Sequence, residues 1–403
     1  MKNNVNPQRK NTGVILDDVS PWKKVETFIL NLYDLQYNEV SNEVEYKSKD
    51  DADFQPLNEN NLYREIQHRQ LKFSLQNLIS LLKSDFVPKV NPFKQYFASL
   101  PKWKEGGQDH ISNLANCVHT KDQNGFIKHF KKMLVRCVAC ALEDQYYNKT
   151  AFILVGEKQH TGKSTFIRFL CPSALEKYIS ETINFSDKDS HIALCDNFII
   201  NIDELAILNK ADLNSLKSFL SKDRTKIRHP FDRKPKSTPR RASFFGSTND
   251  AEFLSDATGS VRWICFELAS IEHPIDYEAY NKNIKIDLVW AQAYSLLKSD
   301  FDKDLTKEEI VANETRNQSF QYSTPELELI QKTYEPSTKD KDGLFMTATD
   351  IFSDLCVDNS WIKTRCNNVA IGKALKILGF KREQSIKPDA KMPTKGYYVK
   401  SLR

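Results

Sequence analysis

Gly162, Lys163 and Ser164 stand in the middle of this 403-residue chain, and in this order they can bind the phosphates of a nucleotide. A short apolar run at 152–156 precedes them, and an apolar-periodic stretch at 166–170 follows. This is the pattern of a strand, a phosphate loop and a helix, in which backbone N–H groups and the helix N-terminus cradle phosphates. Lys163 can then reach the β and γ phosphates of ATP, and the Ser164 hydroxyl can ligate Mg²⁺.

The loop departs from the usual spacing, which places glycine five positions before the Gly-Lys-Ser triplet. Glu157 occupies that position, and Gly156 lies one residue earlier. A surface turn is the alternative interpretation, but the flanking strand and helix favour a phosphate-binding loop. The residues predicted to bind ATP are Gly156, Gln159, Thr161, Gly162, Lys163, Ser164 and Thr165.

Two carboxylates follow a second apolar run, at 198–202, about 40 residues after the loop. Asp203 is predicted to hold Mg²⁺ together with Ser164, and Glu204 to polarise the attacking water as a catalytic base. A strand end that carries two acidic residues is unremarkable alone. Its distance from a phosphate loop favours the functional interpretation.

A third apolar run, at 242–246, leads to Asn249, whose amide can orient the same water. Arg262 comes thirteen residues later, immediately before a fourth apolar run at 263–268. A guanidinium there can complete the site of a neighbouring subunit by stabilising charge on the γ-phosphate. A surface ion pair is the alternative role for Arg262.

These residues require a scaffold whose strands end together. Four apolar runs of strand length, with helical segments between the first three, predict an α/β fold with a mainly parallel sheet buried on both faces. The predicted parts are a disordered tail (1–20), a small mixed α/β domain (21–106), a helical segment (107–148), the ATPase core (149–300), a connector (301–342) and a C-terminal domain (343–403).

Composition indicates a folded protein that does not span a membrane. The chain is 40% hydrophobic and 28% charged, with a formal net charge of +5. It has no apolar run near the ~20 residues that a membrane helix needs, and its polar N-terminus has no secretory apolar core. Eight scattered cysteines fit buried thiols better than a disulfide framework. A cytoplasmic location is therefore expected.

The order of these motifs resembles superfamily 3 helicases, a branch of the AAA+ ATPases, and within them the virulence-associated E (VirE/VapE) proteins of phages and mobile islands. Besides the loop, the similar stretches are 91–93, 100–103, 148–149, 239–241, 246–249 and 289–293. The resemblance covers roughly residues 85 to 300. Glu157 and His160 replace two glycines of the family loop, so His160 must accept the backbone angle imposed there. Val261 stands where the family commonly has a second arginine.

The resemblance implies a homo-oligomer, a hexameric ring that binds ATP between subunits and acts on single-stranded or forked DNA. It also makes a separately encoded primase a plausible partner. Residues 222–241 carry nine basic residues against two aspartates, and they resemble the hairpin that grips DNA in the channel of such rings. The predicted DNA-binding residues are Arg233, Lys234, Lys236, Arg240 and Arg241.

The last 60 residues predict two helices (347–356 and 368–378) and a closing strand, a pattern that suggests a winged helix. Lys373, Lys376, Lys381 and Arg382 lie on or after the second helix. Such a domain binds DNA or packs against a partner, and the sequence supports both equally.

The sequence thus predicts an ATP hydrolase that acts as a DNA helicase or translocase in the replication of a phage or mobile element. A nucleotide-gated switch or defence ATPase that binds without unwinding would use the same motifs. A DNA-binding protein that has lost hydrolysis is a third class, against which Lys163, Ser164, Asp203 and Glu204 argue.

Overall fold

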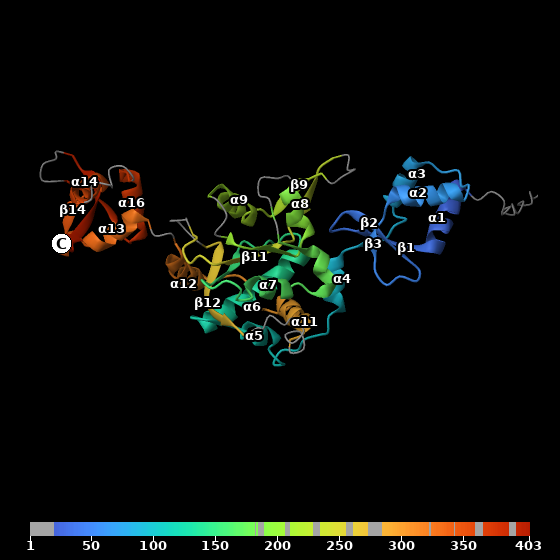
Figure 1. The fold of residues 1–403 in the computed structure, drawn as a ribbon, viewed down its shortest axis with the longest axis horizontal. Helices are drawn as coiled ribbons and strands as arrows, with labels where there is room; N and C mark the ends of the chain where they lie inside the picture. The colour runs from blue at the N-terminus through green and yellow to red at the C-terminus, as the bar shows by residue number, and fades with distance from the viewer. Residues whose placement is uncertain are drawn as a thin grey trace, which may run out of the picture. The chain divides into compact units, whose positions relative to one another are not determined.

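A computed structural model describes residues 20–181, 183, 189–205, 210–228, 234–254, 261–272, 284–321, 324–341, 343–358, 366–386 and 392–403. The described chain divides into two compact units, one that ends at Ser99 and one that begins at Leu100 (Figure 1). Both units mix helices and strands, so the predicted α/β class is confirmed.

The first unit packs helices on a small sheet. Its elements are α1 (Pro21–Leu32), β1 (Tyr33–Asn38), β2 (Glu43–Ser48), β3 (Gln55–Pro56), α2 (Glu59–His68), α3 (Leu75–Leu82), β4 (Lys89–Val90) and α4 (Pro92–Ser99). The sheet order is β3-β2-β1-β4, and β1 and β2 form an antiparallel hairpin. Helix α1 begins where the Ser20 side chain accepts a hydrogen bond from the Lys23 backbone and Pro21 presets the first turn. Val25 and Ile29 of α1 are buried in the core of this unit.

A six-stranded sheet organises the first part of the second unit. Its strands in spatial order are β5 (Val118–Thr120), β12 (Trp263–Ile271), β6 (Ala151–Val155), β11 (Ser243–Thr248), β8 (Ile199–Ile202) and β7 (Ile179–Ser180). The pairs from β12 to β7 are parallel, and β5 is antiparallel to β12. The four predicted apolar runs are strands β6, β8, β11 and β12. Strand β5 lies in a stretch predicted to be mostly helical. It pairs with the end of β12, which extends past the predicted end at residue 268.

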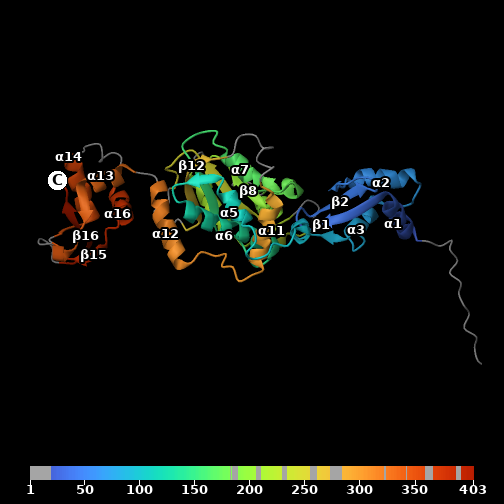
Figure 2. The same cartoon turned by 90° about the horizontal axis from the view of Figure 1, so that it is seen from below.

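Helices cover both faces of this sheet, as the continuous apolar strands predict. The helices and short turns are α5 (His110–Ala115), α6 (Gln123–Leu142), α7 (Lys163–Phe169), η1 (Ser173–Tyr178), α8 (Asp189–Asp196), α9 (Lys210–Leu220), α11 (Ile286–Leu297), α12 (Lys307–Asn317) and η3 (Gln318–Phe320). Helix α6 packs Phe126 and Phe130 against Phe152 of β6 on one face. Leu194 of α8 and Leu216 of α9 belong to the core on the other face. Helix α11 lies beside α6 (Figures 1 and 2).

A two-stranded antiparallel ribbon, β9 (Arg224–Ile227) and β10 (Lys236–Pro239), follows α9. The C-terminal part of the second unit contains α13 (Pro325–Thr333), β13 (Tyr334–Pro336), η4 (Lys339–Lys341), β14 (Leu344–Met346), α14 (Ala348–Asp358), α16 (Asn368–Ile377), β15 (Arg382–Ser385) and β16 (Thr394–Ser401). Strands β13, β14 and β15 each pair antiparallel with β16. Ile351 of α14 and Leu375 of α16 are buried in a core of its own.

Among the residues placed by the structure, no helix combines the length and apolarity that crossing a bilayer requires.

Candidate nucleotide-binding site

Three parallel strands bring the predicted catalytic segments to one edge of the sheet. Strand β11 lies between β6 and β8, with Thr248 opposite Val155 and Gly246 opposite Ile202. The chain leaves β6 at Gly156, whose N–H donates to the Thr248 carbonyl at 3.0 Å. Because ligands bind outside the carboxyl ends of such strands, this edge is where a phosphate site belongs.

Residues 156–162 form the loop between β6 and α7. His160 has φ of 57° and Gly162 has φ of 82°, both in the left-handed region. The expectation that His160 adopts an angle suited to glycine is therefore confirmed, at a cost of about 1–2 kcal/mol for a residue with a Cβ. Gly162 is the N-cap of α7 and provides no side chain to bond its first N–H groups. Those donors face the loop that would hold phosphate.

Lys163 is only 6% exposed, although it carries an ammonium group. Its Nζ lies 2.7 Å from Asn249 Oδ1, 3.0 Å from the Gly156 carbonyl, 3.1 Å from the Lys158 carbonyl and 3.1 Å from Thr161 Oγ1. Burial lowers the pKa of Lys163, and the charge of Asp203 opposes that shift. A phosphate group could replace these four oxygens as the partner of the ammonium, since an ammonium pairs most strongly with an anionic acceptor.

Asp203 collects donors from three parts of the chain. Its Oδ1 accepts from Ser164 Oγ at 2.8 Å, from Ser247 Oγ, and from the Glu204 backbone at 3.2 Å. Burial alone would raise the pKa of Asp203, but the hydrogen bonds from Ser247 and Ser164 outweigh it and leave the pKa below its usual value. The carboxylate is therefore ionised at neutral pH and adjacent to the hydroxyl predicted to share a metal ion.

The remaining predicted loop and base residues lie around this pair. Glu204 is exposed and has φ of 52°, a left-handed conformation that places it in a tight turn after β8. Gln159 is exposed on the loop, and Thr165 is half-buried in the first turn of α7. The amide oxygen of Asn249 contacts Lys163, so the residue predicted to orient water here binds the loop lysine.

Arg262 lies at the amino ends of the parallel strands, away from the carboxyl ends where the loop is. It immediately precedes β12, its carbonyl accepts from the Ala151 N–H at 2.8 Å, and Ala151 is the first residue of β6. The length of β6 therefore separates Arg262 from the loop of its own chain, roughly 16 Å at ~3.3 Å per residue. Its Nε donates to Ser221 Oγ at 3.2 Å, just after α9.

The basic segment divides into buried and exposed residues. Lys234 is exposed just before β10, and Lys236 is exposed at its first residue. Arg233 lies outside the described residues. Arg240 is fully buried and Arg241 is 9% exposed. Arg240 donates to the carbonyls of Phe219, Leu220, Lys222, Ala242 and Asn148.

These contacts give Arg240 a structural role that its place in a basic run did not predict, because its guanidinium is turned away from solvent. Arg241 pairs with Asp144. Neither arginine is presented to a DNA backbone in this structure.

Sequence reasoning did not single out Ser247 and Ser221. Ser247 lies in the Ser-Thr-Asn stretch that closes β11, and a hydroxyl at a strand end beside Asp203 was the available signal. Ser221 carried no signal.

Within the described part of the chain, no cluster of three His, Cys, Asp or Glu residues forms a metal site by itself. The one carboxylate and one hydroxyl of Asp203 and Ser164 fit Mg²⁺, which protein sites usually bind through few side chains together with substrate phosphates.

Comparison with known proteins identifies one family. A family model described as the virulence-associated protein E-like domain matches residues 98–322. Among solved structures, the apo C-terminal region of NrS-1 is 13% identical with a TM-score of 0.53, covering 95% of this chain and 100% of that one. Its A form is 13% identical with a TM-score of 0.51, covering 94% and 99%. At this identity the likeness concerns the fold alone. No curated protein matches the chain.

Proposed function

The chain belongs to the virulence-associated protein E-like family, and on that premise we propose that it hydrolyses ATP to move along or unwind DNA during replication of a phage or mobile element. The observation that carries the proposal is the convergence of a buried lysine with an ionised carboxylate. Lys163 and Asp203 come from different strand–loop junctions, yet Asp203 accepts from Ser164, which follows Lys163 in the chain, and its charge acts on Lys163. Such a pair suits a bound nucleotide and its Mg²⁺.

Each residue has a role in this proposal. Lys163 holds the phosphates in place of its present oxygen partners, and Ser164 and Asp203 hold Mg²⁺. Glu204, exposed at the turn after β8, serves as the base for the attacking water. Bound Mg²⁺ would neutralise charge that develops on the phosphates. Asn249 links Lys163 to the end of β11 and can transfer its amide to the water once phosphate occupies the lysine.

A second subunit completes the site. Because Arg262 stands about one strand length from its own loop, the arginine can reach γ-phosphate only in a neighbouring copy. The proposed assembly is a homo-oligomeric ring, hexameric by family resemblance, with Lys234 and Lys236 of the β9–β10 ribbon as the DNA contacts. A separate primase is a further proposed partner.

ATP turnover with and without single-stranded DNA tests this function. We expect DNA to stimulate turnover of the wild type, and Glu204→Gln to reduce it at least a hundredfold while nucleotide still binds. Glu157→Gln is the matched control, since it makes the same change at an exposed position in the phosphate loop. Nucleotide binding without turnover in the wild type would contradict the motor and favour a nucleotide-gated switch.

A further inference from the structure

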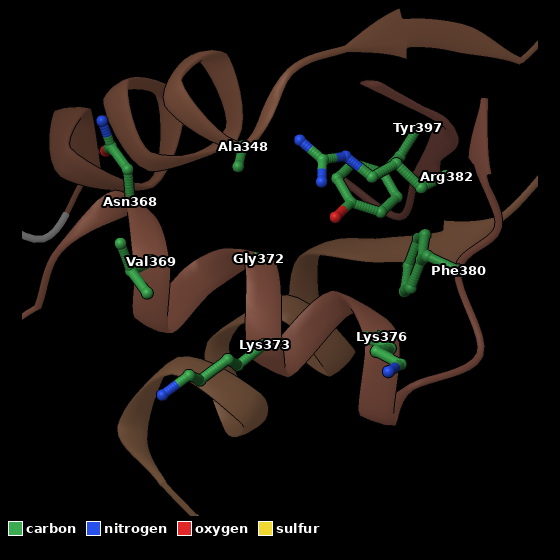
Figure 3. Close-up of a pocket in the computed structure, with 9 residues that line it drawn as sticks. All are labelled: Ala348, Asn368, Val369, Gly372, Lys373, Lys376, Phe380, Arg382 and Tyr397. Carbon is green, nitrogen blue, oxygen red and sulfur yellow. The ribbon is translucent and has the colours of Figure 1, made fainter. Parts of the chain in front are cut away.

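The C-terminal part of the chain contains a pocket that the ATPase proposal does not use. Its volume is about 740 Å³, within the range of small-ligand sites. Helix α16 forms one side, the start of α14 another, and the β15–β16 hairpin a third (Figure 3).

Local geometry explains why these side chains share one space. Asn368, Gly372 and Lys376 are spaced by four residues along α16, so they lie on one face of the helix. The side of α16 next to this face carries Ile371, Ala374 and Leu375, which are buried in the core. The pocket therefore lies against the exposed side of α16, next to its core-facing side.

Strand pairing supplies the other wall. Arg382 of β15 lies opposite Tyr397 of β16 in the antiparallel register, so both side chains project from the same face of the sheet. Glu383 follows Arg382 and projects from the other face. Figure 3 shows Arg382 and Tyr397 together on the side of the pocket facing Ala348.

The pocket has a strongly positive rim. Lys373, Lys376 and Arg382 all line it and are all exposed, and no Asp or Glu is among the lining residues. Across the described part of the chain, none of these three cations has an ion-pair partner. Three exposed cations around a concave space favour an anionic ligand.

The interior of the pocket is apolar and has room. Tyr397 and Phe380 are buried aromatic walls, each 5% exposed. A Cβ built on Gly372 would lie 3.9 Å from the Tyr397 hydroxyl and 4.0 Å from Ala348 Cβ, which are ordinary contacts. A ligand suited to this lining would combine negative charge with an apolar part.

We propose that this pocket binds a nucleotide unit of a single-stranded nucleic acid, with the phosphodiester at Lys373, Lys376 and Arg382 and the base against the apolar interior. A duplex fits less well, because groove reading needs a protruding helix, whereas this face of α16 lies between the walls of a pocket. An acidic peptide would satisfy the cations but leave the aromatic interior without a planar partner. The choice of polyanion rests on the proposed DNA-dependent function.

Fluorescence anisotropy with a labelled oligothymidylate, on the full chain without ATP, tests the charged rim. We expect Lys373→Ala with Lys376→Ala to weaken binding about tenfold and to reduce the salt slope by about 1.4, since each single-strand contact contributes ~0.7. The matched control is Lys339→Ala with Lys341→Ala, two exposed lysines of η4 outside the pocket.

Gly372 tests the interior independently of charge. Gly372→Ala stabilises a helix interior and leaves most of the volume open, so we expect wild-type affinity. Gly372→Leu fills the pocket, and we expect a loss comparable to that of the lysine pair with an unchanged or higher melting temperature. Both variants have the same charge as the wild type.

Three results would overturn the proposal: equal affinity of all variants, tighter binding of duplex than of single strand, and equal competition by polyglutamate. Basal ATP turnover of the same proteins separates this proposal from the ATPase. If the pocket variants keep wild-type turnover but bind DNA more weakly, the pocket proposal is supported. If they keep both wild-type turnover and wild-type binding, the pocket proposal is overturned and the ATPase proposal is not. Absent turnover in the wild type overturns the ATPase and leaves the binding comparison readable.

Discussion

Replacing Arg240 with methionine should make this protein less stable. A residue in the most basic stretch of the chain would more commonly affect DNA binding than stability. Its guanidinium is fully buried and donates to five backbone carbonyls, among them Ala242 at 3.0 Å, Phe219 at 2.9 Å and Leu220 at 3.0 Å. Methionine fills a similar length but donates nothing. Each buried carbonyl left without a partner costs about 1–3 kcal/mol.

The full sum does not apply, because water can reach some of these carbonyls and because burying the guanidinium was itself costly. That cost is visible in the pKa of Arg240, which burial lowers. We therefore expect a net loss of about 3 kcal/mol in the free energy of unfolding, less than the five carbonyls would sum to. For a unit of this size that corresponds to a fall of roughly 5 °C in melting temperature.

Thermal melting followed by tryptophan fluorescence measures the change, since Trp263 and Trp290 are buried in the same unit. Lys234→Met is the control: it should lower DNA affinity and leave the melting temperature within about 1 °C, because Lys234 is exposed. The reasoning is refuted if Arg240→Met melts like the wild type but binds DNA with a smaller salt slope.

Two further predictions concern buried polar groups. Burial lowers the pKa of His129 to about 4, so the folded state keeps this ring neutral while the unfolded state takes up a proton below pH ~6.5. Stability should therefore fall by about 3 kcal/mol between pH 6.5 and 4, and urea unfolding of His129→Gln should lack that part of the decline. Ser247→Ala removes a hydrogen-bond donor to Asp203 and should raise the pKa of that carboxyl. The acid limb of the pH profile of ATP turnover should therefore move to higher pH, with about a fivefold loss of turnover near neutral pH. An acid limb that does not move would count against the assigned role of Asp203.

The parallel sheet followed from the sequence because its strands are continuous apolar runs, and this pattern also predicts which strand ends meet. Lys163, Asp203 and Asn249 lie together for that reason. Strand β5 was not predictable, since three residues within a helical region carry no strand pattern, and it forms only because β12 offers an unpaired edge.

The burial of individual polar residues was the least predictable feature. Arg240 and Lys236 look alike in a basic segment, yet one is buried and the other exposed. What separates them is position: Arg240 is three residues before a fully buried strand, and it satisfies carbonyls at the end of α9. Likewise, the contact of Asn249 with Lys163 depends on the loop conformation, which local sequence does not specify.

Mixing two inactive variants is the measurement that most directly tests a site completed between subunits. Lys163→Ala loses its own site but still carries Arg262, and Arg262→Ala keeps its own loop, so each alone should show little turnover. An equal mixture should recover about a quarter of wild-type turnover, because one interface in four then has both groups. No recovery, in an assembly that contains both variants, would contradict the account.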